Sequence, residues 1–180
     1  MVGDAIGGRV LISQLSCVAC HSSAEPTVAP KSAPILDLVG TRVRFDHLVA
    51  VAGNARGTKV GTTMPDLFHG LSDEQRTANG RAIASFLSQT GKSIDRSGDS
   101  ASSKRGQDLF HSIGCVACHT PRAGDSNLTS TSVPLGDLAQ KYTLDGLSKF
   151  LQNPHQVRPS GLMPTLVTSW TEARDIACYL

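Results

Sequence analysis

Apolar side chains recur through most of the chain at intervals of three and four residues, which is the spacing of one face of an α-helix. In residues 4–16 these positions are Ile6, Val10, Leu11 and Leu15. Alternation of apolar and polar residues, which would predict strands, is negligible. The pattern therefore predicts an all-α protein.

The same spacing predicts the remaining helices. They are expected at 35–39, 44–53, from about Ser72 to 90, 104–113, 135–140, 143–152 and 170–180. The helix that begins near Ser72 should present Ile83, Phe86 and Leu87 to a core, and the last helix should do the same with Ile176, Tyr179 and Leu180. Residues 92–103 are polar, charged and rich in serine, which predicts a linker.

The chain also repeats itself. Residues 8–17 resemble residues 106–115 at an offset of 98, and residues 54–65 align without a gap on residues 153–164 at an offset of 99. We therefore expect two tandem modules, at 1–91 and 104–180. Because the second module ends at the equivalent of Leu87 without a helix stop, a longer parent polypeptide is expected.

Glycine recurs inside both opening helices, as Gly8 and Gly106. A helical glycine costs about 1 kcal/mol relative to alanine, so a packing reason is expected. Close crossing of the opening and closing helices would supply one, with Phe86 or Tyr179 lying against the glycine.

Composition narrows the possible functions. Aromatic residues make up 4% of 180 residues, which leaves little bulk for two ordinary cores, and small modules bury a limited fraction of their surface. A formal net charge of +2 gives no reason to expect nucleic acid or an anionic membrane as partner. No apolar run of about 20 residues is present to span a bilayer.

The candidate chemistry lies in a C-x-x-C-H motif that occurs twice. The copies are Cys17-Val-Ala-Cys20-His21 and Cys115-Val-Ala-Cys118-His119. This spacing lets two thiols bond to the vinyl groups of one porphyrin while the histidine binds the iron, and it is the signature of c-type haem attachment. The motifs predict two covalently bound haem c groups, with His21 and His119 as iron ligands.

Each motif is followed by a methionine at an equivalent place, Met64 in the first half and Met163 in the second. The chain has three methionines, and the third is Met1. A thioether as sixth ligand is typical of electron-carrying cytochromes and raises the reduction potential. The alternatives are methionines that fill gaps in a core, or bis-histidine ligation by His47, His69, His111 or His155. A pair of zinc or dithiol sites would leave the methionines unexplained.

Four cations occupy equivalent places in the two halves. They are Arg42 with Lys141, and Lys59 with Arg158. Arg42 and Arg158 in particular are candidates to pair with haem propionates, although solvated surface charges are the plain alternative. The second ring nitrogen of each proximal histidine should bond a backbone carbonyl, with Pro30 and Pro121 as candidates. The remaining cysteine, Cys178, is expected to be a buried thiol.

These features together resemble tandem class I c-type cytochromes, in which helical modules each wrap around one haem. The two attachment motifs with Met64 and Met163 are similar to the dihaem cytochrome c-four family. The segments 39–43, 153–155 and 175–180 are also similar to cytochrome modules in multidomain proteins of planctomycete bacteria. The resemblance implies His/Met ligation of both irons and a periplasmic or otherwise extracytoplasmic location.

The function implied is single-electron transfer between transient redox partner proteins, without substrate binding at the iron. Further domains of the same polypeptide are another expected partner. Two alternatives remain. A dihaem peroxidase would need one iron with a displaceable sixth ligand, and a haem-based sensor would control an attached domain.

Overall fold

The computed structural model describes residues 5–15, 17–19, 32–59, 61–92, 97–119 and 133–180, and all structural statements concern these residues. Ten α-helices and two 3₁₀ turns are found among them. In chain order they are α1 (Ala5–Gln14), η1 (Cys17–Ala19), α2 (Val39–Arg42), α3 (Phe45–Gly53), α4 (Ala55–Thr58), α5 (Asp73–Ser88), α6 (Ser100–Ser112), η2 (Cys115–Ala117), α7 (Leu138–Lys141), α8 (Leu144–Gln152), α9 (Pro154–Val157) and α10 (Trp170–Tyr179).

The described residues contain no strand, only two isolated bridges, so the predicted all-α class is confirmed at that level. No described helix is long and apolar enough to cross a membrane. Several predicted bounds were wrong. Helices expected at 35–39 and 135–140 lie at Val39–Arg42 and Leu138–Lys141, and α6 begins at Ser100, inside the segment predicted as a linker. Asp99 caps α6, because its Oδ1 accepts the Ser102 amide at 2.8 Å.

Three helices repeat in the structure at the offset of 99 seen in the sequence. They are α2, α3 and α4 in the first half and α7, α8 and α9 in the second. The side chains of Asn54 and Asn153 cap α4 and α9 in the same way, each accepting an amide three residues on. Neither short helix was predicted. Pro154 occupies the first turn of α9, where its missing N–H costs nothing.

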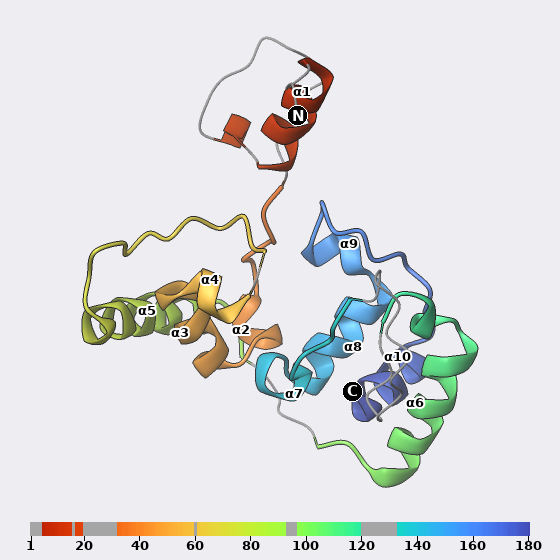
Figure 1. Cartoon of the computed structure of the whole chain (residues 1–180). Coiled ribbons are helices and arrows are strands. Elements are labelled where there is room, and N and C mark those ends of the chain that lie inside the picture. Colours follow the sequence, from red (N-terminus) through yellow and green to blue (C-terminus); the bar gives the residue numbers. More distant parts are fainter. Residues whose placement is uncertain (1–4, 16, 20–31, 60, 93–96, 120–132) are drawn as a thin grey trace.

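In the second half, α6 crosses α10 and α8 lies against the other side of α10 (Figure 1). Phe110 and Ile176 are almost fully buried in this core, with Leu147 and Leu151 from α8. A Cβ built on Gly106 would overlap the Asp175 carbonyl, so the predicted close helix crossing is confirmed here. The ring of Tyr179 lies against Phe110 at 5.6 Å between centroids, and the atoms nearest to a Cβ on Gly106 are those of the Asp175 and Ile176 backbone.

The first half has a smaller core. Here α5 packs on α3, and Gly80 lets the two helices approach because a Cβ there would lie 2.7 Å from the Val49 carbonyl. Val39, Leu48 and Ala84 are the buried apolar residues of this cluster, and Leu87 packs against it. Ser72 forms a reciprocal capping box with Gln75 at the start of α5, as the position of that serine predicted.

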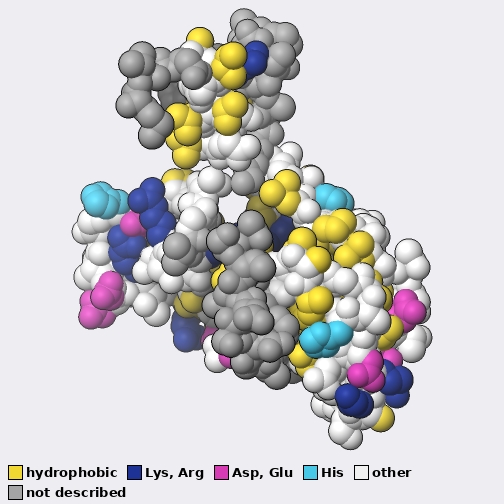
Figure 2. All heavy atoms as spheres, turned by 45° about the vertical axis from the view of Figure 1, so that its right-hand side comes forward, with side chains coloured by type: hydrophobic (Ala, Val, Ile, Leu, Met, Phe, Trp, Pro, Cys, Tyr) yellow, Lys and Arg dark blue, Asp and Glu magenta, His cyan; other side chains and the backbone are white. Residues whose placement is uncertain are grey.

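The opening helix of the first half does not follow the prediction. Figures 1 and 2 show α1 apart from α5, with apolar side chains on the surface, and α1 contains no buried residue. A Cβ on Gly8 would meet no described atom within 4 Å. Phe86 of α5 is 71% exposed and Ile83 is also exposed, so the expectation that both face a core was wrong.

The two halves meet at positions that are equivalent in the repeat. Val43 and Tyr142, 99 residues apart, form an antiparallel bridge. The Thr143 amide donates to the Arg42 carbonyl at 3.0 Å, and the Arg44 amide donates to the Lys141 carbonyl at 2.9 Å. The two equivalent segments run in opposite directions and exchange equivalent hydrogen bonds, so a local two-fold axis relates them.

Candidate haem-binding site

The second C-x-x-C-H motif forms a compact turn at the end of α6. Gly114 adopts a left-handed conformation, with φ of 97°, that turns the chain out of the helix and into η2. The His119 amide then bonds the Cys115 carbonyl at 2.9 Å. Cys115 is buried, which raises the pKa of its thiol, whereas Cys118 is exposed, and both are free thiols. The two sulfurs of the motif are therefore unpaired and available for bonding to a porphyrin.

A backbone carbonyl orients the His119 ring. Its Nδ1 lies 3.1 Å from the Val133 carbonyl oxygen, and because a carbonyl only accepts, this bond places the ring proton on Nδ1. Nε2 then keeps its lone pair for a metal. The Val133 amide also donates to the Cys118 carbonyl at 2.8 Å, which fixes Val133 beside the motif. A carbonyl partner was predicted, but it comes from Val133, while Pro121 lies outside the described residues.

Met163 lies in the segment between α9 and α10. It is half-buried and packs against the same apolar cluster that contains Cys115. Val167 anchors this segment, with 2% of its surface exposed, and Gln152 donates from its Nε2 to the Thr168 carbonyl at 3.0 Å. The structure thus brings Met163 and the attachment cysteine of its half to one core.

The first motif can be described only in part. Cys17 begins η1 and is half-buried, but Cys20, His21 and Pro30 lie outside the described residues. Met64 is half-buried in the segment between α4 and α5, and its amide donates to Thr62 Oγ1 at 3.2 Å. The ligand set predicted for the first half therefore stays a prediction.

Basic side chains from both halves gather near the junction. Here they are termed the basic cluster: His47 and Lys59 from the first half, and Lys141 and Arg158 from the second. Burial, followed by the positive charges of Arg158 and Lys59, lowers the pKa of Lys141 to about 8. Burial, with Lys141 and Arg158, also lowers the pKa of His47. Lys141 is thus repelled by the positive charges of Arg158 and Lys59. An anion bound among these side chains would offset that repulsion.

Aromatic rings hold two of these cations in place. Tyr142 and Phe150 stack at 5.9 Å with 16° between their planes. Lys141 Nζ lies 4.8 Å from the Tyr142 centroid, and Arg158 Cζ lies 5.7 Å from that of Phe150. The cation–ring–ring–cation stack was not anticipated from the sequence, although the alignments of Arg42 with Lys141 and of Lys59 with Arg158 named the cations at its two ends.

Arg42, the counterpart of Lys141, was the other candidate to pair with a propionate, and that pairing stays a prediction. It is buried, with 7% of its surface exposed, and one guanidinium nitrogen donates to the Ile35 carbonyl at 2.7 Å. Burial lowers its pKa. Its Nε is buried and finds no hydrogen-bond partner among the described residues. Arg42 therefore supports the junction with its main chain and keeps one donor unused.

The other histidines and Cys178 lie outside the arrangement described above, and whether a histidine is the sixth ligand stays open. His69, His111 and His155 are exposed, and His111 makes an edge contact with Phe110. Cys178 is half-buried rather than buried and lies beside Gly98. Within the described part of the chain, no three His, Cys, Asp or Glu side chains are placed to hold a metal ion, so a protein-only zinc site is not formed there.

The comparisons with known proteins bear on this half of the chain. Residues 103–179 match the family model described as Cytochrome c. No curated protein and no solved structure matches the chain.

The match supports a c-type cytochrome, and a cytochrome c domain implies covalent haem c. The residues present fit that group. Cys115 and Cys118 are free thiols in the attachment turn, the His119 ring is oriented by Val133, and Met163 packs on the adjacent core. The mutual repulsion within the basic cluster fits a ligand with carboxylate groups.

Proposed function

We propose that this chain is a dihaem c-type cytochrome that transfers single electrons, with one haem c held by each half. The observation that carries the proposal is the second attachment turn, where two free thiols precede a histidine oriented by a carbonyl, and one of those thiols, Cys115, belongs to the core on which Met163 packs. The repeat of α2–α4 as α7–α9, together with the second C-x-x-C-H motif, supports the same role for the first half.

Each residue of the site would have its own role in holding the haem. When bound, haem c supplies a one-electron couple at its iron. Cys115 and Cys118 would tether the group, and His119 would bind from one side with its ring held by Val133. Met163 would bind from the other side with a thioether, which favours a high reduction potential. His21 and Met64 are proposed for the equivalent positions in the first half.

With a histidine and a methionine of the chain both bound to the iron, no position would remain for a substrate, which is why we propose an electron carrier rather than an enzyme. Partners would be redox proteins that bind transiently, since such contacts are usually small. Because c-type haem is attached outside the bacterial cytoplasm, we place the protein in the periplasm or elsewhere beyond the inner membrane. A dihaem peroxidase or a sensor module would instead need one iron open to exogenous ligands.

The proposal is tested by counting haem. The purified protein should carry two haems per chain that remain bound in acidified organic solvent, and Cys115→Ser with Cys118→Ser should leave one. A reductive titration with spectra should show low-spin, methionine-ligated iron for both. One haem per wild-type chain would remove the dihaem assignment, and rapid cyanide binding to one haem would favour the peroxidase.

The basic cluster provides a pH test of haem placement. In the haem-loaded protein we expect the Lys141 pKa to rise from about 8 toward or above its ordinary value of 10.5, because a propionate beside the ammonium favours the charged form. The measurement is an NMR titration with ¹³C-labelled lysine, with Lys141→Arg used for assignment. Lys104, which is exposed on α6, serves as the control. A midpoint that stays near pH 8 would show that no propionate pairs with the cluster.

A further inference from the structure

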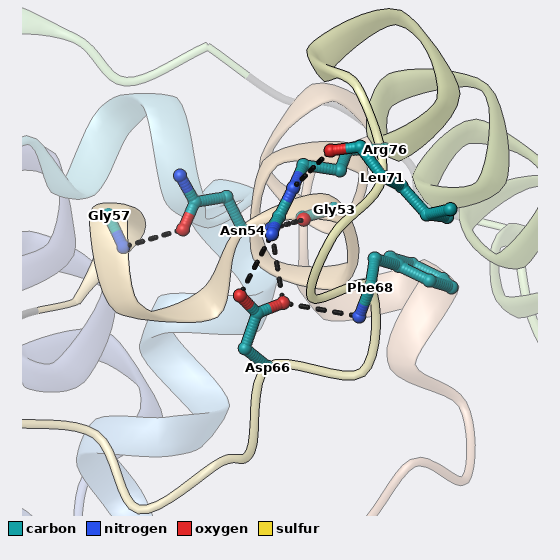
Figure 3. A network of polar contacts seen from close by, with 7 residues as sticks. All are labelled: Gly53, Asn54, Gly57, Asp66, Phe68, Leu71 and Arg76. Carbon is teal, nitrogen blue, oxygen red and sulfur yellow. Dashed lines mark hydrogen bonds and ion pairs between the residues drawn. The ribbon is translucent and has the colours of Figure 1, made fainter.

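The segment that carries Met64 is held by a network that has no counterpart among the described residues of the second half. Figure 3 shows the guanidinium of Arg76, from the first turn of α5, facing the carboxylate of Asp66, two residues after Met64. The two pairs of atoms lie 3.0 and 2.9 Å apart, a bidentate geometry. With 16% and 29% of their side chains exposed, Arg76 and Asp66 are more shielded from solvent than a surface pair.

The same two side chains reach the neighbouring backbone. Asp66 Oδ1 also accepts the Phe68 amide at 3.1 Å, which tightens the turn after Met64. Arg76 donates from Nε to the Leu71 carbonyl at 3.3 Å and from its first terminal nitrogen to the Gly53 carbonyl at 3.5 Å (Figure 3). Arg76 thus connects the end of α3 with both ends of the segment that follows Met64.

The second half holds the equivalent segment with buried apolar side chains and one side-chain hydrogen bond. Thr165 occupies the position of Asp66, so the carboxylate is missing, and the position of Phe68 is taken by Val167, which is buried in the core. Gln152, the counterpart of Gly53, reaches the segment with its side chain and bonds Thr168. Met163 itself packs on the core, whereas Met64 is not among the residues of the first-half cluster or those packed against it.

We propose that Asp66 and Arg76 are positioning residues for Met64, holding its thioether at the first haem in place of the apolar anchor that holds Met163. This inference rests on the proposed function. It implies that the two methionine ligands differ in what keeps them on the iron. Loss of the ion pair should release Met64 and leave Met163 bound.

The test measures each methionine separately in the haem-loaded full-length protein. A thioether bound to iron is protected from alkylation by bromoacetate, and peptide mass mapping distinguishes Met64 from Met163. We expect Asp66→Ala and Arg76→Gln each to lose protection at Met64 while Met163 stays protected, with half of the methionine-to-iron charge-transfer band lost. The matched control is Asp108→Asn, which breaks the exposed pair between Lys104 and Asp108 on α6 and should change neither signal.

A charge exchange separates positioning from general stability. Asp66→Arg combined with Arg76→Asp should restore much of the Met64 protection, and urea unfolding should show that each single variant is folded under the assay conditions. Full protection of Met64 in a folded Asp66→Ala protein would overturn the inference. If Met64 is alkylated in the wild-type protein, Met64 is not an iron ligand and the proposed function fails at this site. That result differs from full protection in Asp66→Ala, which overturns only the role of the ion pair.

Discussion

Replacing Gly106 with alanine is expected to destabilise the second half of the protein by at least the ~1–3 kcal/mol that overpacking costs. The added Cβ would overlap the Asp175 carbonyl, which is main chain and cannot rotate away. To make room, α6 and α10 must separate, and this would disturb the contact of Phe110 with Tyr179. Domains of this size are stable by only about 5–15 kcal/mol, so the loss is large.

The matched variant is Gly8→Ala. A Cβ built on Gly8 has no described atom within 4 Å, so the alanine should not clash. Its higher helix propensity should stabilise α1 by about 0.5–1 kcal/mol. Both variants can be followed by urea unfolding of the haem-loaded protein. Trp170, the single tryptophan, begins α10, and its fluorescence reports on the second half. Equal losses of stability at the two positions would contradict the placement of α1 away from α5.

Replacing Met163 with alanine is expected to give the largest change in redox behaviour. The haem of the second half should stay attached through Cys115 and Cys118, lose its sixth ligand, bind cyanide rapidly and shift to a lower reduction potential. Stability should fall by less than the ~2–5 kcal/mol typical of a fully buried methionine, because Met163 is half-buried. Spectra during a redox titration record the potential and the ligation together.

The comparison is with Met64→Ala, which should change the other haem only. Met64 lies outside the main clusters, so its loss should cost less stability than that of Met163. Unchanged spectra in either variant would remove that methionine from the proposed ligand set. A change in both haems on a single substitution would mean that the two sites are not independent.

Local patterns predicted the features that depend on neighbouring residues. The spacing of apolar residues located α3 and α10 to within a residue, and Ser72 marked the start of α5. The alignment of residues 54–65 with 153–164 anticipated two segments of the same form, and both Asn54 and Asn153 act as caps there. These are short-range properties, set by hydrogen bonds between residues three or four apart.

Features that depend on distant residues could not be read in this way. The partner of His119 is Val133, fourteen residues away across a segment with no regular pattern. Gly8 and Gly106 occupy equivalent places in similar helices, yet only the second is packed against its closing helix. The packing expected between the opening and closing helices of the first module is therefore not seen, since helical spacing reports that a face is apolar but not what covers it.

The junction between the halves has a consequence for how the repeat can diverge. The bridge of Val43 with Tyr142 and the bonds at Arg42 and Arg44 are made by amide and carbonyl groups, which nearly every amino acid supplies. Thr143, Arg44 and Gly146 also contact the other half through a side chain or a close approach. Outside such positions, the side chains of either copy can change with little effect on their mutual orientation. After a gene duplication, each copy can therefore evolve different side chains while the backbone junction keeps the two halves in the same relative orientation.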